Sequence, residues 1–173
     1  VYVTTNPESA PVTLTNGTIS GNGIGISTTS PVPSGLTVAP DNDFSGNGAN
    51  SDQRIPNVPF SGDLFVATGG SDAGNSCMVE ASPCASVEHA AAQSENGDTI
   101  NVGAGTFTSP AAFTITKQIS IVGAGQADTI LEAGFSLGGS NLPWIDVANG
   151  ASLDLSQLTI DGGAPDWSIG IAI

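Results

Sequence analysis

The sequence predicts an all-β fold of the β-solenoid type, in which short strands stack coil upon coil. Three stretches resemble one another, at Val12 to Asn22, Leu36 to Asn47 and Leu153 to Gly163. Each has apolar residues at alternate positions and then a turn of Ser or Asp with Gly and Asn, and such internal repetition is typical of solenoids. Period-2 strands bounded by Gly and Asn recur along the chain, and a helical pattern is almost absent.

Further strands are predicted between these repeats from alternating apolar residues. They are "TINV" at 99–102, "FTI" at 113–115, "ISIVG" at 119–123, "TILEAG" at 129–134 and "WIDVA" at 144–148. An antiparallel β-sandwich is the alternative fold. It is disfavoured because two-residue hairpin turns do not separate these strands.

The stretch "SPCASVEHAAAQSENGD" predicts one short helix, near residues 83–95. Ser82 suits the N-cap, Pro83 suits the first turn, and Gly97 suits the end of an Ala-rich helix. At the start of a solenoid, such a helix would cover the apolar end of the first coil, which otherwise exposes a sheet edge. The chain's lone histidine, His89, lies in this helix and is interpreted as a structural residue.

The chain divides into two solenoid segments, at 1–47 and 63–173, and a linker between them. Residues 48–62 are interpreted as the linker because Gly, Pro, Asn and Ser are frequent there. If residue 1 is placed after residue 173, the repeats follow one another at intervals of about 32 and 24 residues, which is solenoid spacing. We therefore expect residues 1–47 to be terminal coils that complete a β-helix, and residues 63–173 to be its body with the helix.

The two ends of the chain predict an interface. Residues 169–173 alternate apolar side chains with Gly or Ala, which predicts a strand with an unpaired edge. Residues 1–47 could add to this edge within the same chain, on a neighbouring subunit, or across a peptide bond in a tandem array. The last two arrangements give a rod, and we favour them. The predicted interface residues are Val1, Tyr2, Val3, Ile169, Ile171 and Ile173.

Composition limits the partners. Two Lys or Arg stand against sixteen Asp or Glu, a net charge of -14, which argues against nucleic acid or an anionic membrane as a partner. No apolar run is long enough to span a bilayer. The absence of a leading Met and of a signal-peptide pattern predicts a mature or excised chain. With 10% charged residues, the surface must be rich in hydroxyls and amides, and we expect an extracellular or cell-surface location.

Two cysteines and a glycosylation signal suggest modifications. Cys77 and Cys84, in "SCMVEASPC", are spaced to close a small loop through a disulfide, whereas a zinc site would need a further Cys or His. Two reduced thiols are the alternative. The sequon "NGT" at Asn16 would permit N-glycosylation.

The stretch "DNDFSGNGANSD", residues 41–52, has nearly the spacing of a calcium loop. Its predicted oxygen ligands are Asp41, Asp43, Ser45 and Asp52. The last ligand is Asp rather than the usual Glu, and flanking helices are absent. The solenoid repeat accounts for several of these residues without a metal, so calcium binding is a hypothesis only.

Between Asp63 and Gly134 stand the pieces "GSDAGN", "PCASVEHAAA", "GDTINVGAGTF", "ITKQISIVGAG" and "TIL". In order and spacing they resemble the opening of right-handed parallel β-helix proteins of the pectate-lyase-like superfamily, particularly bacterial surface proteins with β-helix repeats. The resemblance implies a right-handed parallel β-helix. It implies little about activity, because one fold hosts many functions.

Enzymes of that superfamily cut acidic polysaccharides with Asp pairs, or with calcium-binding carboxylates and an Arg or Lys base. The cations of this chain are Arg54 and Lys117, neither of which supplies a convincing base in a carboxylate-lined groove. A glycosidase-like pair could be drawn from four carboxylates, but solvated acids on turns and outward faces are the favoured interpretation. The four are Asp146, Asp154, Asp161 and Asp166.

We therefore predict an extracellular structural module that builds a filament, surface fibre or adhesin stalk. Its partners would be copies of itself, with residues 1–47 on the C-terminal edge of the next subunit or repeat. Catalysis is not expected, and no cofactor is expected apart from the hypothetical calcium. The alternative is a polysaccharide-binding or polysaccharide-degrading β-helix protein in which Trp144, Trp167 and Tyr2 stack on sugar rings. For these aromatic residues, packing in the core or in turns is the favoured interpretation.

Overall fold

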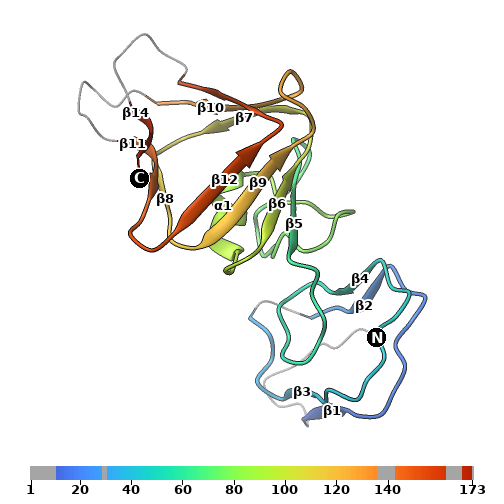
Figure 1. Cartoon of the computed structure of the whole chain (residues 1–173). Helices are drawn as coiled ribbons and strands as arrows, with labels where there is room; N and C mark the ends of the chain where they lie inside the picture. The colour runs from blue at the N-terminus through green and yellow to red at the C-terminus, as the bar shows by residue number, and fades with distance from the viewer. Residues whose placement is uncertain (1–10, 29–30, 136–142, 163–168, 173) are drawn as a thin grey trace.

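The computed structural model describes residues 11–28, 31–135, 143–162 and 169–172 (Figure 1). Within these ranges the chain is all-β apart from one short helix, α1 (Val87–Gln93). No helix in the described part of the chain is both long and apolar enough to cross a membrane. The chain forms two lobes, named here the N-terminal unit (residues 11–60) and the body (residues 61–172) (Figure 1).

The described strands form five small sheets. Two lie in the N-terminal unit: β1 (Val12–Leu14) with β3 (Leu36–Val38), and β2 (Ile24–Ile26) with β4 (Ala49–Ser51). The first body sheet contains β5 (Asp63–Val66), β6 (Thr99–Val102), β9 (Gln118–Gly123) and β12 (Ser152–Ser156). The second contains β7 (Gly105–Ser109), β10 (Thr129–Ala133) and β13 (Thr159–Asp161), and the third contains β8 (Phe113–Ile115), β11 (Pro143–Val147) and β14 (Ile169–Ala172).

Consecutive strands of the body enter the three sheets in turn. The series β6, β7, β8 is followed by β9, β10, β11 and then by β12, β13, β14, and each strand pairs with its counterpart three strands later. All pairings between the described strands are parallel. The antiparallel β-sandwich considered from the sequence is therefore excluded.

Equivalent apolar residues of successive strands lie in register and form columns in the core. Leu64, Ile100 and Ile121 make one column across β5, β6 and β9, and each is fully buried. Phe107 of β7 lies opposite Leu131 of β10 in the next sheet, and both are buried. Full burial of such a side chain contributes about 1.5–3 kcal/mol, so these columns stabilise the stack of strands.

Helix α1 begins later than predicted. Its N-cap is Ser86, whose side-chain oxygen accepts a hydrogen bond from the backbone N–H of His89 at 3.2 Å, so the expected N-cap at Ser82 was wrong. The reason is tertiary: Cys84 forms a parallel bridge with Val66 of β5, which keeps the chain extended there.

Helix α1 shields the core beside the first strands of the three body sheets. It contacts β5, β6, β7 and β8, behind the first sheet in the view of Figure 1. Val87 and Ala90 are buried, and both belong to the core cluster of the body.

The N-terminal unit consists of two similar turns of chain stacked on each other. β1 pairs with β3 and β2 with β4, and an isolated bridge joins Thr18 to Asp43. Hydrogen bonds between the two turns join residues 25 positions apart, as between Gly17 and Asn42. The described strands of the segment predicted as 1–47 therefore pair with one another and with β4.

Residues 48–62 differ from the predicted linker. They include β4, and Ile55 and Val58 are buried in the core cluster of the N-terminal unit. The segment was interpreted as a linker because Gly, Pro, Asn and Ser are frequent in it, but its two apolar residues pack with apolar residues of both turns of chain. This segment therefore helps to close the N-terminal unit before the chain enters β5.

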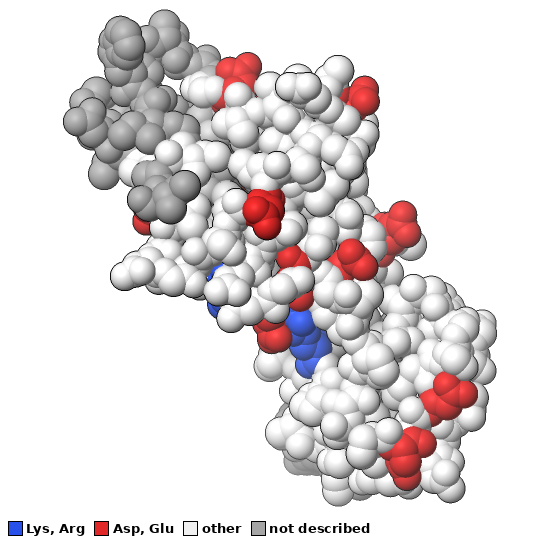
Figure 2. Space-filling view, viewed as in Figure 1, with Lys and Arg blue, Asp and Glu red and all other residues white. Residues whose placement is uncertain are grey.

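Arg54 joins the N-terminal unit to the body. Its guanidinium donates to the Asp98 carboxylate and lies 3.6 Å from that of Glu95. The Ser76 hydroxyl donates to the Asp52 carbonyl across the same junction. Basic side chains lie near this junction, beside acidic ones, whereas other acidic side chains are scattered over both lobes (Figure 2). The N-terminal unit thus adjoins the β5 end of the body, away from β12 (Figure 1).

Candidate functional site

The end of the body formed by β12, β13 and β14 is incompletely covered. These three strands are the last in their sheets, and no other described strand pairs with their outer edges. The edge of a parallel sheet presents unpaired backbone N–H and C=O groups that can receive another strand. This end, named here the open end, is a candidate docking surface.

Side-chain burial distinguishes the open end from the strands beneath it. Leu153 and Leu155 of β12 lie in register with Ile119 and Ile121 of β9. The two isoleucines are 4% and 0% exposed, whereas the two leucines are only half-buried. The second sheet shows the same contrast between Leu131 of β10 and the last strand, β13. The apolar columns therefore reach the open end without a layer above them.

Part of the predicted interface lies at this open end. Ile169 and Ile171 are in β14 and pair with Pro143 and Ile145 of β11. Ile171 is half-buried and packs against the core of the body. The other predicted interface residues, Val1, Tyr2, Val3 and Ile173, lie outside the described residues.

A second incompletely covered face lies on the first turn of the N-terminal unit. Val12 and Leu14 of β1 are half-buried and pack against the core of this unit. Leu14 lies in register with Val38, which is 3% exposed. In the described part of the chain, β1 and β2 have a strand partner on one side only. This face, named here the first-turn face, has the same parallel, apolar character as the open end.

Two asparagines tie the turns of the N-terminal unit together, a role not predicted from the sequence. The side-chain oxygens of Asn42 and Asn47 accept from backbone N–H groups 25 residues earlier, at 3.0 and 3.1 Å. Each side-chain nitrogen donates to carbonyls 28 and three residues earlier, at distances between 2.6 and 2.9 Å. In the sequence, the signal for this role was two asparagines in turns five residues apart.

The predicted calcium ligands are not gathered into a group of three carboxylates among the described residues. Asp43 accepts a hydrogen bond from the backbone N–H of Ser45 at 2.9 Å, and this bond lowers the pKa of Asp43. Asp52 accepts from the backbone N–H of Thr28 at 2.9 Å, on the preceding turn of chain. Asp41 is exposed. Calcium binding stays a prediction.

The predicted disulfide is confirmed. Cys77 and Cys84 are joined with an S–S distance of 1.97 Å, and both are fully buried. His89 brings a nitrogen within 4.8 Å of these sulfurs, so a third metal-ligand side chain that sequence spacing did not reveal is present. The Nε2 atom of His89 lies 2.7 Å from the Asn75 carbonyl oxygen. Because a carbonyl oxygen can only accept, the Nε2–H group donates this hydrogen bond. With both sulfurs bonded to each other, neither is a free thiolate that could bind a metal.

The carboxylates considered for catalysis lie on different sheets. Asp146 is in β11, Asp154 in β12 and Asp161 in β13, and the last two are exposed. Asp166 lies outside the described residues. Of the two cations, Lys117 donates to the Ser94 carbonyl at 2.8 Å, and Arg54 pairs with carboxylates at the junction.

Trp144 packs in the core, which was the favoured interpretation, and its alternative sugar-stacking role is excluded. The Trp144 side chain is 2% exposed and belongs to the core of the body, so it offers no face to a sugar ring. Alternation along β11 did not reveal that both Trp144 and its neighbour Ile145 are buried, although their side chains point to opposite faces of the strand. Trp167 and Tyr2 lie outside the described residues. Asn16 is exposed in a turn with a positive φ of 46°, and its glycosylation stays a prediction.

Membership of the pectate-lyase-like superfamily also stays a prediction. Comparison of the chain with protein-family models, with curated proteins and with solved structures found no match.

Proposed function

We propose that this chain is a right-handed β-solenoid module of an extracellular rod, and that it joins to copies of itself head to tail. The solenoid is supported by the strand order of the body, where strands enter three parallel sheets in turn. It is also supported by the in-register apolar columns, because stacked coils place equivalent residues above one another.

One observation carries the proposed assembly: the apolar columns at the open end are only half-buried. Leu153 and Leu155 are as apolar as the isoleucines beneath them, yet they keep part of their surface exposed. Covering apolar surface stabilises by about 25 cal/mol per Å². A further coil laid on β12, β13 and β14 would therefore be stabilised by these side chains and by backbone hydrogen bonds.

The first-turn face of a second copy is the proposed occupant of the open end. It offers strands that pair in parallel and half-buried apolar side chains, Val12 and Leu14. The junction contacts of Arg54 and Ser76 hold the N-terminal unit at the β5 end, which disfavours closure of the two faces within one molecule. A contact between unlike faces does not close on itself, so repetition gives a rod. Units in a tandem array would use the same contact.

An extracellular location is supported by the disulfide, because such bonds persist in oxidising compartments. A polysaccharide-binding function has less support, because one of the three aromatic side chains predicted for it, Trp144, is buried.

The test is a charge placed in an apolar column at the open end. We expect the unmodified chain to associate with rising concentration in sedimentation velocity and to form rods in electron microscopy. The Leu155→Lys variant should remain monomeric, because an added coil would bury an unpaired ammonium group. Ser156→Lys is the matched control: it makes the same charge change on the same strand at an exposed position, and it should assemble.

The proposal fails if the unmodified chain stays monomeric at all concentrations, or if Leu155→Lys assembles as well as Ser156→Lys. Circular dichroism of both variants shows whether the body has folded. Leu155 is only half-buried, so the long Lys side chain can extend into water in the monomer.

A further inference from the structure

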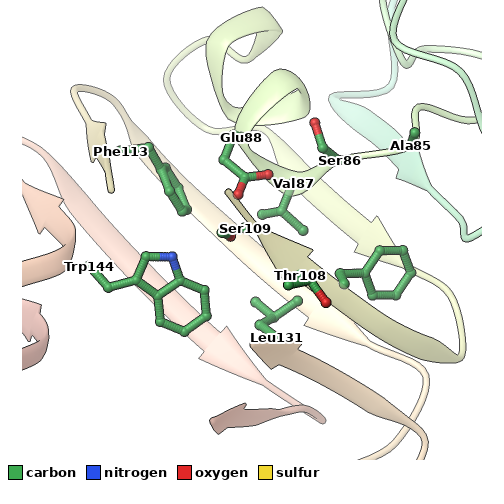
Figure 3. Close-up of a pocket in the computed structure, with 10 residues that line it drawn as sticks. Ala85, Ser86, Val87, Glu88, Thr108, Ser109, Phe113, Leu131 and Trp144 are labelled. Atoms are coloured by element: carbon green, nitrogen blue, oxygen red, sulfur yellow. The ribbon is translucent and has the colours of Figure 1, made fainter. Parts of the chain in front are cut away.

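A small cavity lies between the start of α1 and strands β7, β8, β10 and β11 (Figure 3). Apolar side chains form much of its wall, among them Val87, Phe113 and Leu131. Glu88 reaches it from α1, and Trp144 reaches it from β11. Strands β10 and β11 separate this cavity from the outer edges of β13 and β14, and nothing in the proposed assembly uses it.

Two buried polar atoms of this cavity have no hydrogen-bond partner in the protein. One is the indole nitrogen Nε1 of Trp144, and the other is the carboxylate oxygen Oε1 of Glu88. Figure 3 shows the indole nitrogen and the Glu88 carboxylate facing the same space, with Ser109 between them in this view. Trp144 is 2% exposed, so bulk water does not satisfy its N–H. Buried polar groups without partners are rare in folded proteins because their desolvation is costly.

We propose that this cavity is a binding site for one hydroxyl group, held between Glu88 and Trp144. The indole N–H can only donate, and a carboxylate can only accept. A single occupant that satisfies both must accept from Trp144 and donate to Glu88. A hydroxyl does both.

Other ligand classes fit less well. An ammonium group would donate to Glu88 but leave the Trp144 N–H unpaired. An anion would accept from Trp144 but would be repelled by the Glu88 carboxylate. The space open to a water-sized molecule is about 30 Å³, and about 10–15 Å³ is enough for one water. The occupant is therefore a water or the hydroxyl end of a small polyol.

A crystal structure tests the site directly. In crystals grown without polyols, we expect an oxygen within about 2.7–3.2 Å of both Glu88 Oε1 and Trp144 Nε1. Soaking in ethylene glycol then distinguishes the two sources, because either the water remains or a glycol hydroxyl takes over the same two bonds. An empty cavity, a direct bond between Glu88 and Trp144, or replacement of the oxygen by soaked methylammonium would overturn the proposal.

A solution measurement tests the role of Glu88. In ¹⁵N-labelled protein without polyols, the Trp144 indole N–H should show a cross-relaxation signal to a long-lived bound water, and Trp144→Phe assigns this resonance. Glu88→Met removes the acceptor at similar size and should abolish the signal. Gln93→Met, at an exposed position of the same helix, should preserve it. Persistence of the signal in a folded Glu88→Met variant would show that Glu88 does not hold the hydroxyl.

Discussion

At the scale of single residues, Asp72 connects the loop before the disulfide to the start of α1. Its carboxylate accepts from the backbone N–H groups of Ala85 and Ser86, at 2.7 and 3.2 Å, and from the Ser86 hydroxyl at 2.7 Å. Partial burial acts to raise the pKa of Asp72. The hydrogen bonds from Ser86 and Ala85, with the nearby His89, outweigh burial and lower that pKa below its ordinary value.

We expect Asp72→Asn to reduce stability in a pH-dependent way. Because the pKa of Asp72 is lower in the folded state, its contribution is complete above about pH 4 and is lost as pH falls through the folded pKa. The variant should lose about 1–2 kcal/mol at neutral pH, and the difference from the unmodified chain should narrow at pH 3. Urea unfolding at both pH values measures this. Glu80→Gln, at an exposed position, serves as control; an equal loss at both pH values would contradict the prediction.

At the scale of elements, Gly123 shows how closely the end of β9 approaches the chain that follows β12. It ends β9, and a Cβ atom added there would lie 2.2 Å from the Gln157 carbonyl oxygen and 2.8 Å from the Cβ of Thr129. Thr129 is fully buried, and its hydroxyl donates to the Gly103 carbonyl at 3.0 Å. A side chain at 123 would therefore force apart backbone and side chains that have no free space to enter.

Gly123→Ala should destabilise the body by about 1–3 kcal/mol, the usual cost of overpacking a tightly packed site. Gly69→Ala is the matched control, because an added Cβ there meets nothing within 4 Å. Thermal unfolding of the two variants makes the comparison. Equal melting temperatures would mean that the end of β9 and the chain after β12 can move apart without cost.

Individual elements could be predicted where local patterns decide them. The strands expected at 99–102 and 113–115 have the bounds of β6 and β8, because alternation of apolar and polar residues marks a half-buried strand. The helix start could not be predicted, because pairing of Cys84 with Val66 decides it. In the same way, the burial of Ile55 depends on a turn of chain that precedes it in the sequence.

At the scale of the whole molecule, Arg54 is a main tie between the two lobes. Its guanidinium pairs with Asp98, which is 6% exposed, and lies 4.4 Å from the centre of the Phe60 ring. The Asp98 carboxylate also accepts from the backbone N–H of Glu95 at 2.7 Å. The Ser76 hydroxyl donates to the Asp52 carbonyl across the junction, so part of this junction is independent of Arg54.

Arg54→Met should loosen the junction while both lobes stay folded. Limited proteolysis within residues 53–62 should become about fivefold faster, the equivalent of about 1 kcal/mol for a partly exposed ion pair. Lys117→Met is the matched control, since it removes the other cation at a site within the body, where Lys117 donates to Ser94. Unchanged cleavage in Arg54→Met would show that the remaining contacts suffice.

For the candidate site, the sequence correctly indicated a strand at residues 169–172 and the disulfide between Cys77 and Cys84. It could not show that both Trp144 and its neighbour Ile145 are buried, because their side chains point to opposite faces of β11 and other elements must cover each face.

By itself, the sequence determined the all-β class, the recurring short strands and the cysteine pairing, because these follow from the spacing of residues that are near one another along the chain. Only the tertiary structure decided what closes each lobe, which aromatic side chains are buried and where the apolar columns remain uncovered. Those outcomes depend on contacts between residues 25 or more positions apart, as in the asparagine bonds of the N-terminal unit. Local pattern does not encode such contacts, since each depends on how segments far apart in the sequence pair with one another.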